Sequence, residues 1–216
     1  MMRNDIRPDA NKVLDALEGL YPEAKAELHF SNPYETLIAT ILSAQCTDVR
    51  VNQVTPALFE QYPNPASMAR LTPEELEPLI KSCGLYHSKA KNIIAACRAI
   101  VNDHGGQIPQ DRKALMSLPG VGQKTAGVVL LAAFGDDQIP VDTHVFRVSN
   151  RIGLARATTP NAVEQQLREA IPKSRWSHAH HLIIWHGRRC CKAIHPDCAR
   201  CPLADALCQK NDLEDN

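Results

Sequence analysis

The sequence contains 216 residues, of which 44% are hydrophobic and 22% are charged, and 24 basic residues balance 24 acidic ones. This composition excludes a disordered chain, and the length provides for one sizeable core or two modest lobes. The longest apolar run, residues 126–135, is too short to span a bilayer and the N-terminus is polar, so we expect a cytoplasmic protein without a membrane segment. Because the net charge is zero, any attraction to nucleic acid has to come from a local surface.

Apolar residues at helical spacing occur along nearly the whole chain, and no segment shows the alternation of a strand. The sequence therefore predicts an all-α fold. In chain order, the predicted helices are 8–20, 33–45, 48–62, 72–82, 88–104, 111–118, 123–134, 143–153, 160–171 and 176–187. A short acidic tail, 211–216, follows them.

The most informative stretch is LPGVGQKTAGVVLLAAFG, residues 118–135. Pro119, Gly120 and Gly122 predict a tight turn that opens a helix, and Lys124 lies in the first turn of that helix. The N–H groups at a helix start attract an anion, and a lysine strengthens the attraction. Such a turn between two helices holds a DNA backbone without reading its sequence. The alternative interpretation is that Lys124 is a solvated surface residue without a binding role.

A nucleotide-binding P-loop is the main local alternative, because GQKT resembles the end of its motif. Gln123 and Ser117 stand where that motif has glycine, and the segment before the turn reads as a helix rather than a strand. The sequence therefore favours two helices joined by a glycine-rich hairpin.

A candidate carboxylate follows in IPVDTHVFRVSNR, residues 139–151. Asp142 stands at a predicted helix start, where the simplest interpretation is an N-cap. The functional alternative is that Asp142 folds back towards Lys124, which would pair a nucleophile with an electrostatic partner.

Five of the eight cysteines crowd into nineteen residues, which in a cytoplasmic protein indicates a metal site more often than disulfides. Four of them have the spacing C-x6-C-x2-C-x6-C and are Cys191, Cys198, Cys201 and Cys208. Spacing alone leaves zinc and an iron–sulfur cluster equally open, with a disulfide framework third.

The remaining cysteines and the histidines carry weaker signals. Cys46, Cys83 and Cys97 lie in apolar, helical surroundings, where we expect buried inert thiols. The histidines of HAHHLIIWH lack ligand spacing on one helical face, so we expect packed or surface side chains; they are His178, His180, His181 and His186.

Five sequence motifs resemble those of the endonuclease III family and follow one another in the same order. The members of this family are DNA glycosylases and abasic-site lyases of the helix-hairpin-helix superfamily that act in base excision repair. The resemblance runs from about residue 10 to Cys208, and the motifs span 42–48, 84–93, 118–129, 141–151 and 180–188.

The resemblance implies two helical lobes that flank a DNA cleft. One is a six-helix lobe, about 26–136, with the helix-hairpin-helix at about 111–135. The other joins residues 1–25 to 137–216 and holds a [4Fe-4S] cluster in the loop 191–208. By the same resemblance, the cluster ligands are Cys191, Cys198, Cys201 and Cys208.

The resemblance also implies an activity and its residues. Gly120 and Gly122 lie where the family grips the phosphate beside the lesion, and Lys124 where it attacks C1′ of the damaged nucleotide. Asp142 would stabilise positive charge on the sugar, while Gln45 and Leu85 match the wedge residues that fill the gap left by the extruded base. The implied function is a bifunctional glycosylase and lyase acting on oxidised pyrimidines or abasic sites in double-stranded DNA, as a monomer at the nucleoid.

On composition alone, Leu85 would instead be assigned to the core. A monofunctional adenine-DNA glycosylase of the same superfamily and a non-catalytic helix-hairpin-helix module are the alternative functions. The presence of Lys124 argues against a monofunctional adenine-DNA glycosylase. A lyase assay would distinguish the enzyme from a non-catalytic module.

Two departures from the family pattern concern the cysteine loop. The last spacing is C-x6-C where the family usually has C-x5-C, and we expect a short helix before Cys208 to take up the extra residue. The segment KAIHPD, 192–197, is less basic than the family's loop, which weakens its expected contribution to phosphate binding. Cys190 would be a spectator, since choosing it as a ligand stretches the first spacing to C-x7-C.

Overall fold

The computed structural model describes residues 7–210, and the acidic tail at 211–216 lies outside them. Helices joined by loops and turns make up the described chain, which contains no strand, so the predicted all-α fold is confirmed. No helix within residues 7–210 has the length and apolar character needed to cross a membrane. The chain divides into two compact units, Ala26–Asp136 and residues 7–25 together with 137–210.

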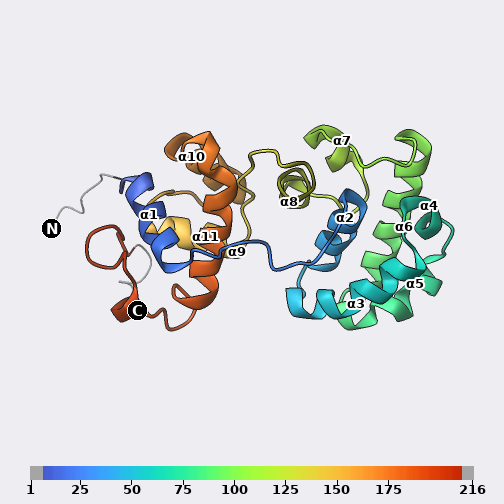
Figure 1. Cartoon of the computed structure of the whole chain (residues 1–216), viewed down its shortest axis with the longest axis horizontal. Coiled ribbons are helices and arrows are strands. Elements are labelled where there is room, and N and C mark those ends of the chain that lie inside the picture. Colours follow the sequence, from blue (N-terminus) through green and yellow to red (C-terminus); the bar gives the residue numbers. More distant parts are fainter. Residues whose placement is uncertain (1–6, 211–216) are drawn as a thin grey trace. The chain divides into compact units, whose positions relative to one another are not determined.

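The unit Ala26–Asp136 contains seven α-helices and one 3-10 turn (Figure 1). In order, they are α2 Pro33–Leu42, α3 Asp48–Gln61, α4 Pro65–Ala69, α5 Pro73–Ile80, η1 Lys81–Cys83, α6 Tyr86–Asp103, α7 Arg112–Ser117 and α8 Gln123–Phe134. Helix α6 packs against α4 and α5, and α2 packs against α8. Their buried faces form one core that includes Leu37, Ile38, Ile93 and Leu130.

The second unit joins an N-terminal helix to the C-terminal part of the chain (Figure 1). Its elements are α1 Ala10–Leu20, α9 Thr143–Ile152, α10 Pro160–Ala170, η2 Lys173–Arg175, α11 Trp176–Arg189 and η3 Cys198–Arg200. Helix α11 packs against α9 and α1. Its separate core includes Leu14, Val148, Leu167 and Ile183.

Side-chain caps explain most helix starts. Asp9, Asn32, Thr47, Asp111 and Thr159 each accept a hydrogen bond from a backbone N–H in the first turn that follows. These groups have no acceptor within the helix, so each cap contributes about 1 kcal/mol.

Apart from shifts of one or two residues at helix ends, two features of the structure differ from the prediction. Helix α2 ends at Leu42, so residues 43–45 form a turn rather than a last helical turn. The unit 26–136 has one helix more than the six expected, because the five-residue α4 is too short to show helical periodicity.

Candidate active site and metal centre

The hairpin between α7 and α8 is a tight turn. Helix α7 ends at Ser117, and the carbonyl of its C-cap residue Leu118 accepts the Val121 N–H at 3.1 Å. Gly120 has a φ of +78°, which favours glycine, whereas Gly122 is extended and caps α8. Lys124 follows as the second residue of α8. The structure therefore has the helix, hairpin and helix expected from the sequence, with Lys124 in the first turn.

A close contact fixes the hairpin against α6. A Cβ added to Gly120 would lie 2.8 Å from the Cβ of Asn92, a distance that real side chains do not show. A Cβ added to Gly122 would meet nothing within 4 Å. Position 120 therefore requires glycine because of its positive φ and because of the adjacent Asn92 side chain. Neither reason applies at position 122.

Asp142 is the N-cap of α9. Its Oδ1 accepts the backbone N–H of His144 at 2.9 Å and that of Val145 at 2.8 Å. The cap interpretation is thus correct, and it leaves room for a second role because both bonds use one oxygen. Asp142 belongs to the unit that contains residues 137–210 and Lys124 to the unit 26–136, so their pairing stays a prediction.

Gln45 and Leu85 share an unusual backbone. Their φ angles are +52° and +48°, a left-handed conformation that is rare for residues other than glycine and asparagine. Gln45 is exposed, and Leu85 is 55% exposed although its side chain is apolar. Assignment of Leu85 to the core would be wrong, since this side chain projects from the N-cap position of α6 into solvent.

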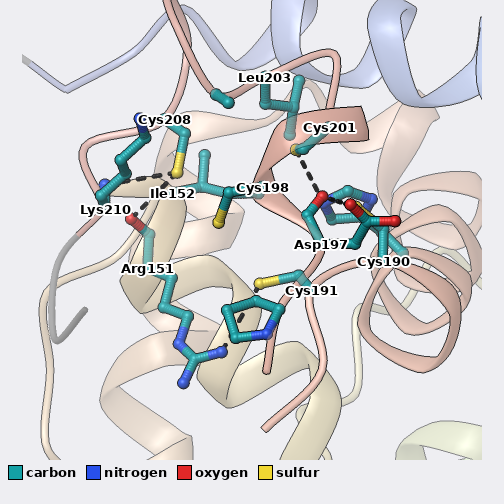
Figure 2. A pocket seen from close by; sticks show the side chains of 13 residues that line it. Arg151, Ile152, Cys190, Cys191, Asp197, Cys198, Cys201, Leu203, Cys208 and Lys210 are labelled. Atoms are coloured by element: carbon teal, nitrogen blue, oxygen red, sulfur yellow. Dashed lines mark hydrogen bonds between the residues drawn. The ribbon is translucent and has the colours of Figure 1, made fainter. Parts of the chain in front are cut away.

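All five C-terminal cysteines line one pocket (Figure 2). Its apolar wall comes from Ile152, Leu203 and Ala204. The regular structure of segment 190–208 is one 3-10 turn, Cys198–Arg200. Figure 2 shows Cys191, Cys198, Cys201 and Cys208 around this pocket, which brings together the four cysteines predicted from the spacing.

Hydrogen-bond donors reach two of these sulfurs. Arg151 approaches the Cys191 Sγ with its Nη1 at 3.9 Å, and the Lys210 N–H donates to the Cys208 Sγ at 3.3 Å. Burial raises the pKa of the Cys191 and Cys208 thiols, and Arg151 opposes this rise at Cys191. Such donors stabilise thiolate ligands, so this set of donors fits a metal centre with sulfur ligands.

His186 and Cys190 extend the cysteine group in a way that the sequence did not reveal. The His186 Nε2 lies 3.6 Å from the Cys201 Sγ, and its Nδ1 lies 3.2 Å from the Tyr21 hydroxyl. The ligand atoms of His186, Cys190 and Cys201 all lie within 4.8 Å of one another. Burial lowers the pKa of His186 to about 4, which keeps the ring neutral. His186 is packed as expected. Its separation of four residues from Cys190 is the sequence feature that could have indicated that the two side chains lie close together.

Two arginines of α9 hold the start of the cysteine loop. Arg147 donates to the carbonyls of Gly187 and Cys191 at 3.0 and 3.1 Å. Arg151, one turn later, donates to the carbonyls of Lys192 and Ala193 at 2.6 and 3.2 Å. Sequence reasoning gave neither arginine a role, although both lie in the motif 141–151 at helical spacing. Helix α9 therefore carries Asp142 at its start and the supports of the cysteine loop along its length.

The end of the cysteine loop differs from the expectation. Residues 202–207 form consecutive turns rather than a short helix, with a single hydrogen bond of helical type from the Leu207 N–H to the Leu203 carbonyl. The extra residue before Cys208 is thus accommodated in irregular backbone. Cys83 and Cys97 are buried as expected, whereas Cys46 lies partly exposed in the turn after α2.

Comparisons with known proteins agree with this geometry. The HhH-GPD superfamily of base excision DNA repair proteins matches residues 38–173. The chain is 48% identical over 203 residues to the endonuclease III of Bacillus subtilis, which covers 94% of this chain and 92% of that protein. The chain belongs to the endonuclease III family. The family member of Escherichia coli K12 is 45% identical over 204 residues, covering 94% and 96% of the two chains.

Solved structures of an endonuclease III and of a thymine-DNA glycosylase share the fold. A non-covalent endonuclease III–DNA complex matches with a TM-score of 0.89 and 48% identity, covering 93% of this chain and 94% of that one. A thermostable thymine-DNA glycosylase matches with a TM-score of 0.81 and 25% identity, covering 92% and 94%. Endonuclease III membership makes this chain a DNA glycosylase and abasic-site lyase of base excision repair.

Proposed function

We propose that this chain removes oxidised pyrimidines from double-stranded DNA and then cleaves the strand on the 3′ side of the abasic site. The observation that carries the proposal is the place of Lys124, in the first turn of α8 directly behind the Gly120–Gly122 hairpin. A primary amine is the one side-chain nucleophile that can form a Schiff base with the sugar. The helix start beside it favours a phosphate.

Lys124 is the proposed nucleophile. The damaged nucleotide first leaves the stack, because C1′ is inaccessible to attack within the duplex. The neutral Nζ then bonds to C1′, and the glycosidic bond breaks with its electron pair going to the base. A proton passes from this nitrogen to the departed base. The C1′–O4′ bond then breaks with its electron pair going to O4′, which takes up a proton from water, and an iminium joins Lys124 to C1′. This cation acidifies the C2′ proton, whose removal expels the 3′ phosphate, and water finally releases the unsaturated aldehyde from the lysine.

Asp142 is the proposed electrostatic partner. One oxygen of its carboxylate is fixed by two backbone N–H groups at the start of α9, so the group has a defined orientation. A fixed carboxylate stabilises positive charge that develops on the sugar, and it does so without reorganising during the reaction.

DNA contacts come from the hairpin and from two exposed side chains. The backbone around Gly120 and Gly122 would bind the phosphate beside the lesion, as a contact that positions the strand without reading bases. Gln45 and Leu85, exposed on strained backbone, would enter the space left by the flipped nucleotide. We place the chain at the nucleoid as a monomer.

The proposed cofactor is a [4Fe-4S] cluster with Cys191, Cys198, Cys201 and Cys208 as ligands. Four sulfurs around one pocket, hydrogen-bond donors to two of them and a loop with little structure of its own support this assignment. When bound, the cluster would cross-link the loop and stabilise its fold. Arg147 and Arg151 orient the first ligand by holding the backbone around Cys191.

An incision assay tests the proposal. The purified protein is incubated with one duplex that contains thymine glycol, one that contains an abasic site and one without damage. We expect release of the damaged base and strand cleavage on both damaged duplexes, with a 3′ unsaturated aldehyde and no cleavage of the undamaged one. Base release without cleavage would indicate a monofunctional glycosylase. Binding without either reaction would indicate a non-catalytic helix-hairpin-helix module.

A further inference from the structure

Lys89 is a buried lysine that the reaction does not use. Its side chain belongs to α6 and is only 4% exposed. The Nζ donates to the Leu42 carbonyl at 2.8 Å and to the Cys83 carbonyl at 2.8 Å. Within residues 7–210, no carboxylate pairs with it, and both acceptors are backbone carbonyls, one 47 residues earlier and one six residues earlier in the sequence. A lysine is rarely buried without such a reason.

The two carbonyls stand at the bases of the segments that carry Gln45 and Leu85. Leu42 ends α2, and the turn 43–47 begins directly after it. Cys83 ends η1, and Gly84 and Leu85 follow before α6 begins at Tyr86. One ammonium group therefore joins the ends of two helical elements immediately before the two exposed side chains.

The backbone at both positions needs such support. A left-handed residue other than glycine costs about 1–2 kcal/mol, and it persists only where the surroundings determine it. Gln45 and Leu85 both adopt this conformation, and Leu85 also keeps an apolar side chain in solvent. Both segments therefore need restraint from the surrounding structure, and the two bonds of the Lys89 side chain lie at their bases.

We propose that Lys89 is a positioning residue that holds the segments of Gln45 and Leu85 at a fixed separation, so that both side chains enter the DNA together at an extruded nucleotide. The inference rests on the proposed function for the part concerning DNA. Burial lowers the pKa of Lys89, yet a neutral amine keeps two N–H donors for two acceptors.

Substitution of Lys89 by Met tests the restraint because it keeps most of the side-chain volume and removes both donors. Lys91→Met, two residues away on the exposed face of α6, is the matched control. Lys89→Gln, which keeps one amide donor group on a shorter side chain, serves as a second variant if Lys89→Met does not fold. All measurements use the full chain with its metal centre, at a temperature well below unfolding.

Hydrogen–deuterium exchange gives the first readout, which does not depend on DNA. We expect faster exchange of the amides in 43–47 and 84–86 in the Lys89 variant, and unchanged exchange in α8 and in the Lys91→Met control. Uniformly faster exchange over the unit 26–136, or unchanged exchange in the two segments, would overturn the proposal.

Binding to a duplex with a reduced abasic site gives the second readout. We expect Lys89→Met to lose roughly tenfold in lesion affinity, with binding to undamaged duplex within about twofold of wild type. Leu85→Ala should show a similar loss, and the double variant should be no weaker than the worse single variant, because both changes remove one wedge. Wild-type discrimination in Lys89→Met, or additive losses, would contradict the positioning role. If wild type itself shows no lesion preference, the proposed function fails, while the exchange experiment still decides whether Lys89 restrains the segments.

Discussion

The side chain of Asn92 lies directly against Gly120, so close that a Cβ on the glycine would stand 2.8 Å from the Asn92 Cβ. Asn92 belongs to α6 and Gly120 to the hairpin between α7 and α8, so this contact seats the hairpin on the unit's longest helix. The position of Lys124 depends on the same contact, because α8 begins directly after Gly122 and Lys124 is its second residue.

Gly120→Ala and Gly122→Ala form a matched pair of substitutions in this hairpin. We expect Gly120→Ala to lower the free energy of unfolding by about 2–4 kcal/mol, because it adds a left-handed alanine and a clash. Gly122→Ala has an ordinary φ and open space, so its cost should stay within about 1 kcal/mol. Chemical denaturation of both variants measures the difference, and equal losses would contradict this account of the hairpin.

Asp142→Asn separates the cap from the charge. Asparagine caps a helix as well as aspartate does, so stability should change by less than about 0.5 kcal/mol. If the carboxylate stabilises charge on the sugar, turnover should fall by about a hundredfold or more, while lesion binding persists. Single-turnover base release and thermal unfolding give the two values. Undiminished turnover would leave Asp142 with the cap alone.

Cys190 is the test of the ligand assignment, because its sulfur lies near Cys201 and donates to the Asp197 carbonyl at 3.3 Å. We expect Cys190→Ser to keep the broad visible absorbance and the full iron and sulfide content. Cys191→Ser and Cys208→Ser should lose both and become poorly soluble, because a lost ligand frees the loop. A colourless Cys190→Ser with an intact Cys191→Ser would overturn the assignment, and zinc in place of iron would overturn the cluster.

Arg151 should be needed for the loop that carries Cys191. Its guanidinium is buried and serves two carbonyls and one sulfur, which the single ammonium of lysine cannot match in geometry. We expect Arg151→Lys to cost about 1–3 kcal/mol and to speed loss of iron in mild oxidant. Arg200→Lys, in the same loop but exposed and paired with Asp197 only at 4.0 Å, is the control. Equal iron retention in both variants would show that Arg151 is not needed to hold the cysteine loop.

Helices and their starts were predictable from the sequence because capping residues and apolar periodicity act locally. Asp142 caps α9 as predicted, and α7 and α10 begin within one residue of the predicted starts, with Asp111 and Thr159 as their caps. Helix α4 was missed, although Asn64 and Ser67 form a capping box there, because five residues are too few for a periodic pattern.

Residues whose role depends on tertiary contacts were not predictable in the same way. Lys89 bonds a carbonyl 47 residues earlier, and Arg151 bonds one 41 residues later, so no local pattern announces either contact. The left-handed backbone of Leu85 was equally hidden, since leucine has no preference for it. The family resemblance supplied Gln45 and Leu85 as candidates, and only the structure showed that both are exposed and strained.

Borohydride trapping tests the central claim, that Lys124 attacks the sugar, most directly. The protein reacts with duplex containing an abasic site, and borohydride reduces the iminium to a stable covalent adduct that denaturing electrophoresis resolves. We predict an adduct with wild type and with Lys113→Gln, an exposed lysine of α7, and none with Lys124→Gln, which should still bind the same duplex. An adduct of normal yield in Lys124→Gln would show that another amine is the nucleophile and would contradict the account.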